Sequence, residues 1–500
     1  MVAYRRRMMV KRRRWVWFLI VVSCVACTST SEAGESSSTT ASITAESSTT
    51  LPSLSTTSTY VDPSNVSDPV SGDVLWPGGP TAEVLDLDRA GFEIPAYQSF
   101  EFCGDRPRPG HLSAFSKDDG TERWSVEVPW PAWSEAGLVG DRVVMLVEAG
   151  WGIAGSALAI DTDGRPAWQT RLSWSPIGSP LVFRDLIVFA VRSSTRGAGV
   201  VALDSSDGSV AWGAPLDTVP LVDASSGLVA VDRFAVITDR RSQLSAIDMS
   251  TGRVAWQTSL GGRVDEAARS DGDHVYAVAG EVLYSVDGST GEIRWRVESS
   301  PAAQVYSVMG VTDQTVVAVV ENADTLPVSG LFVIAGFDQD DGGLLWMAES
   351  SDWVATGPDI VLTDQPGERD DVNPVRAWNP TTGRQIWSVD FEASLRLTAI
   401  HKDFVYLPGH SSVAQIRKQD GRKTWDAPLG GLATAPPLLS SDSIYVAWLG
   451  TGGSTQIARI ELSNGDVTWA GDLIDPARGV PIATTEAIIV LTASTLAPCA

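Results

Sequence analysis

A glycine followed four residues later by a tryptophan recurs along the chain, and this repeat constrains the fold more than any other feature. The residue before each glycine is Asp, Thr or Asn, and successive tryptophans are 38 to 51 residues apart. The nine pairs are Gly120/Trp124, Gly164/Trp168, Gly208/Trp212, Gly252/Trp256, Gly291/Trp295, Gly342/Trp346, Gly383/Trp387, Gly421/Trp425 and Gly465/Trp469. A period of about 40 to 45 residues is typical of β-propellers with four strands per blade.

Residues 243–260 show how one copy folds. The first half alternates apolar with small or polar residues, which is the period of a half-buried strand. The segment from Asp248 to Gly252 supplies turn residues, and a second strand follows through Trp256. We call these two strands C and D. Apolar runs between the hairpins, such as residues 228–231 and 234–238, supply strands A and B.

The predicted fold is therefore all-β, a propeller of eight or nine blades. Each motif tryptophan stands on strand D, and we expect it to dock against the next blade because one sheet cannot bury both of its faces. A small residue six positions before the glycine, such as Ala246, would leave room for an adjacent indole.

The two ends of the repeat region complement each other. The first hairpin, residues 111–128, has no preceding A and B strands, whereas the last two runs, residues 480–484 and 487–492, have no following C and D strands. Joining them gives one composite blade that closes the ring. Cys103 and Cys499 flank these segments, so we predict a disulfide between them in an oxidising compartment. The alternative is two unpaired thiols.

The N-terminal region has the composition of a targeting segment followed by a tether. Residues 1–27 combine seven basic residues with an apolar run too short to span a membrane. Their end, VVSCVAC, resembles a bacterial lipobox, with Cys24 or Cys27 as the lipidated residue; a plain signal peptide is the alternative. Residues 28–59 are rich in Ser and Thr and predict a disordered tether. Residues 60–102 form an irregular lead-in, and residues 103–500 the propeller.

The charge of the chain restricts its partners. The net charge is −24, and cleavage after the targeting segment would remove seven basic and no acidic residues, leaving −31. Such a surface argues against nucleic acid, because nothing would neutralise the phosphates. Membrane attachment would then depend on the acyl chains. The targeting segment predicts that the protein lies on the extracytoplasmic side of the cell membrane.

The repeat resembles that of the quinoprotein-like (PQQ-repeat) β-propellers. The resemblance rests on units such as AIDMSTGRVAW and ALDSSDGSVAW. Propellers of this type usually have eight blades, and the same repeat builds the lipoprotein of the bacterial outer-membrane β-barrel assembly machinery. Catalytic members use pyrroloquinoline quinone with a Ca²⁺ ion, and many carry two adjacent cysteines. Here Cys103 and Cys499 are not adjacent, so no catalytic, cofactor-binding or metal-binding residue is carried over.

The sequence offers little other chemistry. The four histidines show no metal-ligand spacing. The acidic runs at residues 161–164 and 338–341 resemble Ca²⁺ ligands, but their place at the turn between strands C and D predicts that they cap that turn.

Long connections point to a binding face. In an up-and-down blade, the D–A and B–C connections emerge on one face, here called the insertion face, and the A–B and C–D turns on the other, the turn face. The long connections are mostly B–C: residues 148–156, 192–199, 321–330, 364–374 and 449–455. Five tryptophans outside the motif fall in or beside insertion-face connections: Trp130, Trp133, Trp151, Trp174 and Trp353. They predict an exposed aromatic contact surface, unless the rings pack under their own loops.

These features together favour a non-enzymatic, membrane-anchored scaffold, monomeric, that binds a protein partner through the insertion face. A quinoprotein dehydrogenase is one alternative. A propeller that binds cell-wall glycan is another, favoured by the tryptophans but without an assignable polar sugar clamp.

Overall fold

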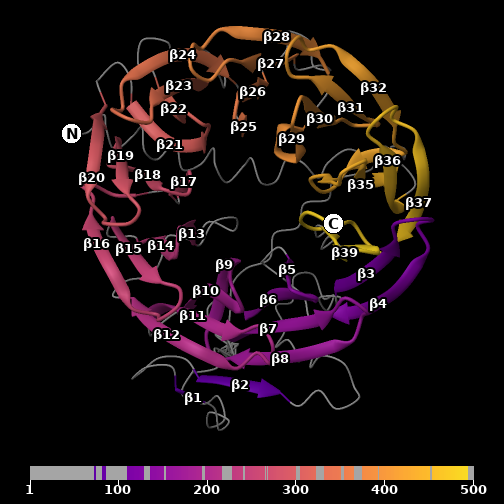
Figure 1. Ribbon diagram of the computed structural model, residues 1–500, viewed down its shortest axis with the longest axis horizontal. Coiled ribbons are helices and arrows are strands. Elements are labelled where there is room, and N and C mark those ends of the chain that lie inside the picture. The colour runs from indigo at the N-terminus through magenta and orange to yellow at the C-terminus, as the bar shows by residue number, and fades with distance from the viewer. Residues whose placement is uncertain are drawn as a thin grey trace, which may run out of the picture. The chain divides into compact units, whose positions relative to one another are not determined.

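The computed structural model describes residues 73–74, 81–85, 110–128, 136–150, 154–193, 197–216, 228–239, 242–264, 266, 268–299, 304–321, 332–350, 354–364, 374–391, 394–450 and 453–493. They form nine antiparallel sheets arranged in a ring (Figure 1). The helical structure in these residues is a single short 3-10 turn, η4 (Leu395–Leu397). Over the described ranges, no helix is long and apolar enough to cross a membrane. The all-β prediction is confirmed.

We number the blades 1 to 9 by their motif tryptophans. Blades 1 to 3 consist of β38 (Ile482–Ala483), β39 (Ala487–Thr492), β3 (Gly110–Ser116) and β4 (Glu122–Val128); β5 (Gly137–Val139), β6 (Arg142–Gly150), β7 (Ala154–Asp161) and β8 (Pro166–Leu172); and β9 (Ser175–Phe183), β10 (Leu186–Ser193), β11 (Gly197–Asp204) and β12 (Val210–Leu216). Blades 4 to 6 consist of β13 (Val229–Val231), β14 (Phe234–Thr238), β15 (Gln243–Asp248) and β16 (Val254–Ser259); β17 (Arg269–Ser270), β18 (His274–Ala279), β19 (Val282–Asp287) and β20 (Ile293–Glu298); and β21 (Gln304–Val311), β22 (Thr315–Glu321), β23 (Phe332–Asp338) and β24 (Leu344–Ser350). Blades 7 to 9 consist of β25 (Val354–Gly357), β26 (Ile360–Asp364), β27 (Pro374–Trp378) and β28 (Gln385–Asp390); β29 (Ala399–His401), β30 (Phe404–Pro408), β31 (Ser412–Arg417) and β32 (Lys423–Pro428); and β33 (Gly431–Ala433) with β34 (Leu438–Leu439), β35 (Ser443–Gly450), β36 (Thr455–Glu461) and β37 (Val467–Leu473).

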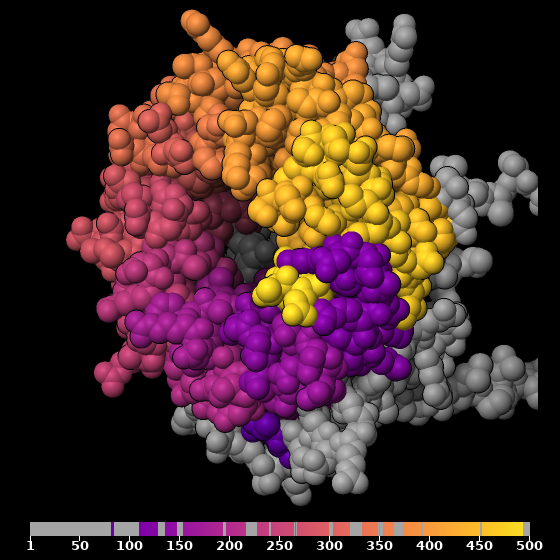
Figure 2. Space-filling view, turned by 45° about the vertical axis from the view of Figure 1, so that its right-hand side comes forward, coloured from indigo at the N-terminus to yellow at the C-terminus, as the bar shows by residue number. Residues whose placement is uncertain are grey.

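Blade 1 closes the ring from the two ends of the chain. Strand β3 pairs antiparallel with β39, from His111 opposite Thr492 to Ser116 opposite Ala487. Figure 2 shows the C-terminal strands, in yellow, lying against the N-terminal strands, in indigo. The predicted composite blade is confirmed, and the ring has nine blades rather than eight.

The motif tryptophans hold the blades together. Each indole lies against the motif glycine of the following blade, and Trp469 of blade 9 lies against Gly120 of blade 1. Each indole N–H also donates a hydrogen bond to a main-chain carbonyl in that blade's C–D turn. The nine pairs of donor and acceptor residue are Trp124 and Thr162, Trp168 and Ser205, Trp212 and Met249, Trp256 and Gly288, Trp295 and Gln339, Trp346 and Pro380, Trp387 and Lys418, Trp425 and Leu462, and Trp469 and Lys117. The same contact therefore seals all nine seams.

A small residue commonly stands opposite the tryptophan on strand C of the same blade. Ala246 pairs with Trp256, and Gly336 pairs with Trp346, where a methyl group would lie 2.3 Å from the indole. Blades 8 and 9 depart from this rule, with Gln415 and Arg459 in the equivalent position, opposite Trp425 and Trp469 respectively.

The lead-in, for which we expected irregular structure, contributes two strands. β1 (Asp73–Val74) pairs with β2 (Thr81–Leu85), and β2 pairs with the outer edge of β8 (Figure 1). Ala82 lies opposite Leu172 and is buried with it. Blade 2 therefore carries an added strand on its outer edge.

Candidate functional site on the insertion face

The two faces of the ring differ in the length of their connections. Chain segments between strands on the turn face contain two to six residues. On the insertion face, twelve residues join β12 to β13 and ten join β22 to β23. Loops that are long and not required for strand pairing are free to carry binding residues. We therefore expect a binding site on the insertion face.

The motif tryptophans take no part in an accessible site. Trp295 and Trp387, for example, are 8% and 6% exposed. A methyl group on Gly342 would lie 2.8 Å from the indole of Trp295, and one on Gly421 would lie 2.7 Å from the indole of Trp387. Rings enclosed in this way by the next blade act as structural contacts between blades.

The tryptophans proposed for the insertion face fall into two groups. Trp130, Trp133, Trp151 and Trp353 lie outside the described residues. Trp174 is described, and it corrects the prediction: it is 4% exposed and belongs to the core between blades 2 and 3, with Leu172 and Phe189. A ring this deeply buried supplies packing and no accessible contact surface.

The described part of the insertion face carries an apolar patch that the sequence analysis missed. Leu432, Leu449 and Ile474 lie at this end of blade 9 and are 44%, 36% and 58% exposed. Leu432 stands directly opposite Leu449 in the β33–β35 pairing. Ile474 follows Leu473, the last residue of β37, and Leu473 lies in the same row as Leu449 through Thr455 of β36. We call these three residues the blade 9 patch.

Buried packing holds the blade 9 patch in place. Trp448, beside Leu449, is 5% exposed and packs with Leu429 and Ala433 in the core. The side-chain amide of Gln456 on β36 donates a hydrogen bond to Asp472 on the outer strand β37 at 2.8 Å. An apolar centre on a rigid base beside polar side chains is the usual composition of a protein contact.

A positional signal for the patch exists in the sequence. Ile474 stands five residues after its motif tryptophan, where the other eight repeats have Pro129, Ser173, Asp217, Gly261, Ser300, Ser351, Glu392 and Gly430. Aligning the repeats on the tryptophan would therefore have exposed Ile474 as the exceptional residue. A search for tryptophans alone could not have identified it.

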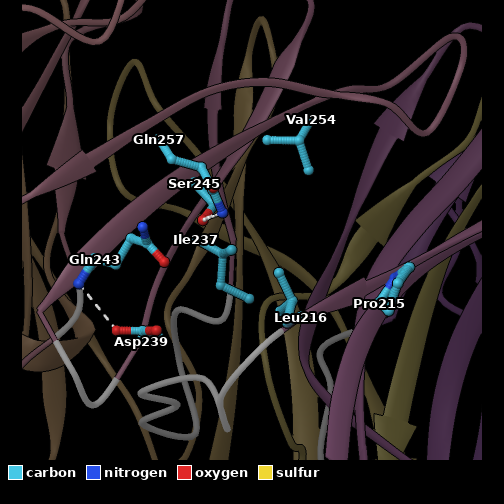
Figure 3. A pocket seen from close by; sticks show the side chains of 8 residues that line it. All are labelled: Pro215, Leu216, Ile237, Asp239, Gln243, Ser245, Val254 and Gln257. Carbon is cyan, nitrogen blue, oxygen red and sulfur yellow. Dashed lines mark hydrogen bonds between the residues drawn. The ribbon is translucent and has the colours of Figure 1, made fainter.

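A hollow lies in the seam between blades 3 and 4. It has a volume of about 220 Å³ and is lined by Pro215, Leu216, Ile237, Asp239, Gln243, Ser245, Val254 and Gln257 (Figure 3). Its polar groups bond to one another: the Gln257 side-chain amide donates to Ser245 Oγ at 3.2 Å, and the Gln243 main-chain N–H donates to Asp239 at 2.9 Å. These two bonds hold part of the polar lining within blade 4.

The acidic turns act as caps on the turn face. Asp338 Oδ1 accepts the main-chain N–H of Asp340 at 2.8 Å, and Asp341 Oδ1 accepts that of Gly343 at 2.7 Å. In blade 5 the Ser289 hydroxyl and two turn N–H groups lower the pKa of Asp287 from 3.8 to about 2. Over the described ranges, no group of three or more His, Cys, Asp or Glu could hold a metal ion.

Comparison with known proteins assigns the fold to a family. Residues 108–263, 196–352 and 371–497 match the family described as outer membrane protein assembly factor BamB, over more than half of the chain. The chain belongs to this family. A comparison with curated proteins finds no match.

Among the solved structures similar to the chain are two that show the extent of the likeness. BamB from Moraxella catarrhalis is 14% identical, with a TM-score of 0.40; the match covers 63% of this chain and 95% of that one. The computationally designed Ika8 protein is also 14% identical, with a TM-score of 0.43; the match covers 64% of this chain and 94% of that one.

Proposed function

We propose that this protein is a non-enzymatic scaffold, lipid-anchored on the extracytoplasmic side of the cell membrane, that binds a protein partner through its insertion face. The blade 9 patch carries the proposal, because it exposes apolar side chains on the face that has the long connections. The family description, an assembly factor of outer membrane proteins, supports a role in protein contacts within the cell envelope.

The anchor would be an acylated Cys24 or Cys27, followed by the tether of residues 28–59. Radiolabelled fatty acid fed to cells should label the full-length protein. Label that persists in Cys24→Ser and is lost in Cys27→Ser assigns Cys27, and the reverse assigns Cys24. Absence of label from the unsubstituted protein would contradict the anchor.

The partner proposal is tested by in-cell cross-linking of the full-length protein and its Ile474→Ser variant. We expect the variant to lose its principal cross-linked partner while its thermal unfolding is unchanged, because Ile474 is 58% exposed. Val467→Ser is the matched control: Val467 is 43% exposed at the opposite end of the same strand, β37. Equal loss in both variants would contradict an insertion-face site.

Two alternative functions have direct assays. Oxidation of alcohols or sugars by the purified protein with pyrroloquinoline quinone and Ca²⁺ would establish a dehydrogenase. Retention on insoluble peptidoglycan would favour glycan binding, an interpretation that the burial of Trp174 weakens, since sugar rings stack on accessible aromatic faces.

A further inference from the structure

The hollow between blades 3 and 4 combines apolar and polar lining. Blade 3 contributes Pro215 and Leu216, the last two residues of β12, and blade 4 adds the apolar side chains of Ile237 and Val254. The other four lining residues are polar and all belong to blade 4 (Figure 3). None of the eight lining residues is Lys, Arg or His. A ligand in this hollow would therefore meet apolar surface and polar groups but no positive charge.

Strand pairing in blade 4 sets the polar side chains next to one another. Ser245 stands opposite Gln257 in the β15–β16 pairing and opposite Ile237 in the β14–β15 pairing. Gln243 lies two positions before Ser245 on β15, so the two side chains point to the same face of the sheet. Ile237 packs across the seam in the same core cluster as Leu216 of blade 3. The sheet thus holds these polar groups on the wall that blade 4 turns towards blade 3.

These side chains keep hydrogen-bonding groups that the fold does not use. The Gln257 amide nitrogen donates to Ser245 Oγ at 3.2 Å, and the Gln257 amide oxygen has no partner among the described residues. The side-chain amide of Gln243 makes no hydrogen bond within the described ranges either. Gln243 is half-buried and Gln257 is exposed, so both amides can be reached from solvent. Each amide offers N–H donors and an acceptor oxygen to a ligand.

The open groups select among classes of ligand. An apolar ligand would cover the amides of Gln243 and Gln257 without bonding to them, which is unfavourable. An anion would lie beside Asp239 with no basic side chain in the lining to pair with it. A hydroxyl group both donates and accepts, so it can pair with either end of an amide. The C–H groups of a polyol ring can in turn cover apolar residues such as Leu216 and Val254. The lining therefore matches a neutral ring that carries several hydroxyl groups.

The size of the hollow limits this ligand to one small ring. Its volume of about 220 Å³ is below the range of about 300–1,000 Å³ found for drug-sized ligands. We propose that the hollow between blades 3 and 4 binds one neutral, polyhydroxylated ring, either a free monosaccharide or the end residue of a glycan chain. The site involves other blades than the blade 9 patch, and it does not depend on the proposed protein partner.

The test is ligand-observed saturation-transfer NMR on the purified full-length protein, with glucose, N-acetylglucosamine and inositol as probes. We expect a saturable signal from at least one of them. Glucuronate and glucosamine carry the same ring as glucose with a negative or a positive charge, and both should bind more weakly. Retained binding of the methyl glycoside of the bound sugar identifies a chain-end residue, and its loss identifies a free monosaccharide. Absence of a saturable signal from all three neutral probes, or tighter binding of a charged one, would overturn the proposal.

Three variants assign the binding to the hollow. Gln243→Leu should weaken it by about five- to tenfold, with unchanged thermal unfolding, because the fold does not use this side-chain amide. Val254→Trp should abolish it by filling the hollow, and Val254 is 45% exposed, so the core is not disturbed. Gln385→Leu makes the matched substitution at an exposed position of β28, outside the hollow, and should leave binding unchanged. Equal losses in the two glutamine variants, or undiminished binding by Val254→Trp, would overturn the assignment.

Discussion

The indole N–H of Trp469 donates a hydrogen bond to the main-chain carbonyl of Lys117 at 2.9 Å, across 352 positions of sequence. The ring of Trp469 also lies against Gly120, so the last motif tryptophan docks on the first motif turn. The ring is thus closed twice, by the pairing of β3 with β39 in blade 1 and by this contact between blades 9 and 1.

Removing the closing indole should destabilise the ring as strongly as removing an internal one. Trp469→Ala opens a cavity over Gly120 and leaves the Lys117 carbonyl without its donor, and we expect a loss of about 3–5 kcal/mol in the free energy of unfolding. Trp256→Ala, in the seam between blades 4 and 5, should cost a similar amount. Denaturant titration of both variants checks this. A cost below about 1 kcal/mol for Trp469→Ala would show that strand pairing alone closes the ring.

The motif glycines are required by space as well as by backbone conformation. A methyl group at Gly252, where φ is 67°, would lie 2.6 Å from the indole of Trp212. Gly140 has a similar φ of 61° and no atom within 4 Å of such a methyl group. Gly140→Ala should therefore lower the free energy of unfolding by about 1–2 kcal/mol, the cost of the left-handed conformation alone. Gly252→Ala should lower it by clearly more, because its methyl group also clashes with the indole. Equal unfolding midpoints would contradict the steric role of the glycine.

The sequence predicted the repeating part of this molecule and not its exceptions. The composite blade follows from counting strands at the two ends, and the hairpin follows from the Asp248–Gly252 turn. Residue type alone could not place Trp174, because a tryptophan in a connection looks the same whether it covers a seam or faces solvent. The patch residue Ile474 is visible only as a departure from the other repeats. Its exposure follows only from the three-dimensional arrangement.

The burial of Trp174 makes it a stability residue. Trp174→Ala should lower the free energy of unfolding by about 3–5 kcal/mol, because its ring fills the core between blades 2 and 3. Val182→Ala on the adjoining strand β9 is the control and should change it by less than about 0.5 kcal/mol, since Val182 is 46% exposed. If both variants unfold at the wild-type midpoint, the tryptophan is not a core residue.

The cap at Asp287 should make blade 5 sensitive to acid. The Ser289 hydroxyl donates to this carboxylate at 2.7 Å and the Thr290 N–H at 2.8 Å, which lowers its pKa to about 2. Because the folded pKa lies below the unfolded value of 3.8, the stabilisation is complete above 3.8 and is lost as the pH falls towards about 2. Asp287→Asn should therefore unfold more easily than wild type near neutral pH, with the difference disappearing in that window. A difference that does not vary with pH would contradict the ionised cap.

The predicted Cys103–Cys499 disulfide would lock the pairing of β3 with β39, the closure within blade 1. Both cysteines lie outside the described residues, but Cys103 precedes Gly110 by seven positions and Cys499 follows Thr492 by seven. The strands they flank, β3 and β39, pair with each other, so the chain enters and leaves the ring side by side. A crosslink closing so long a loop should stabilise by several kcal/mol, about 6 in the chain-entropy model. Reductant should lower the unfolding midpoint of the wild type to that of Cys103→Ser, and leave the variant unchanged. Recovery of both cysteines as alkylated free thiols from unreduced, membrane-extracted protein would rule the crosslink out.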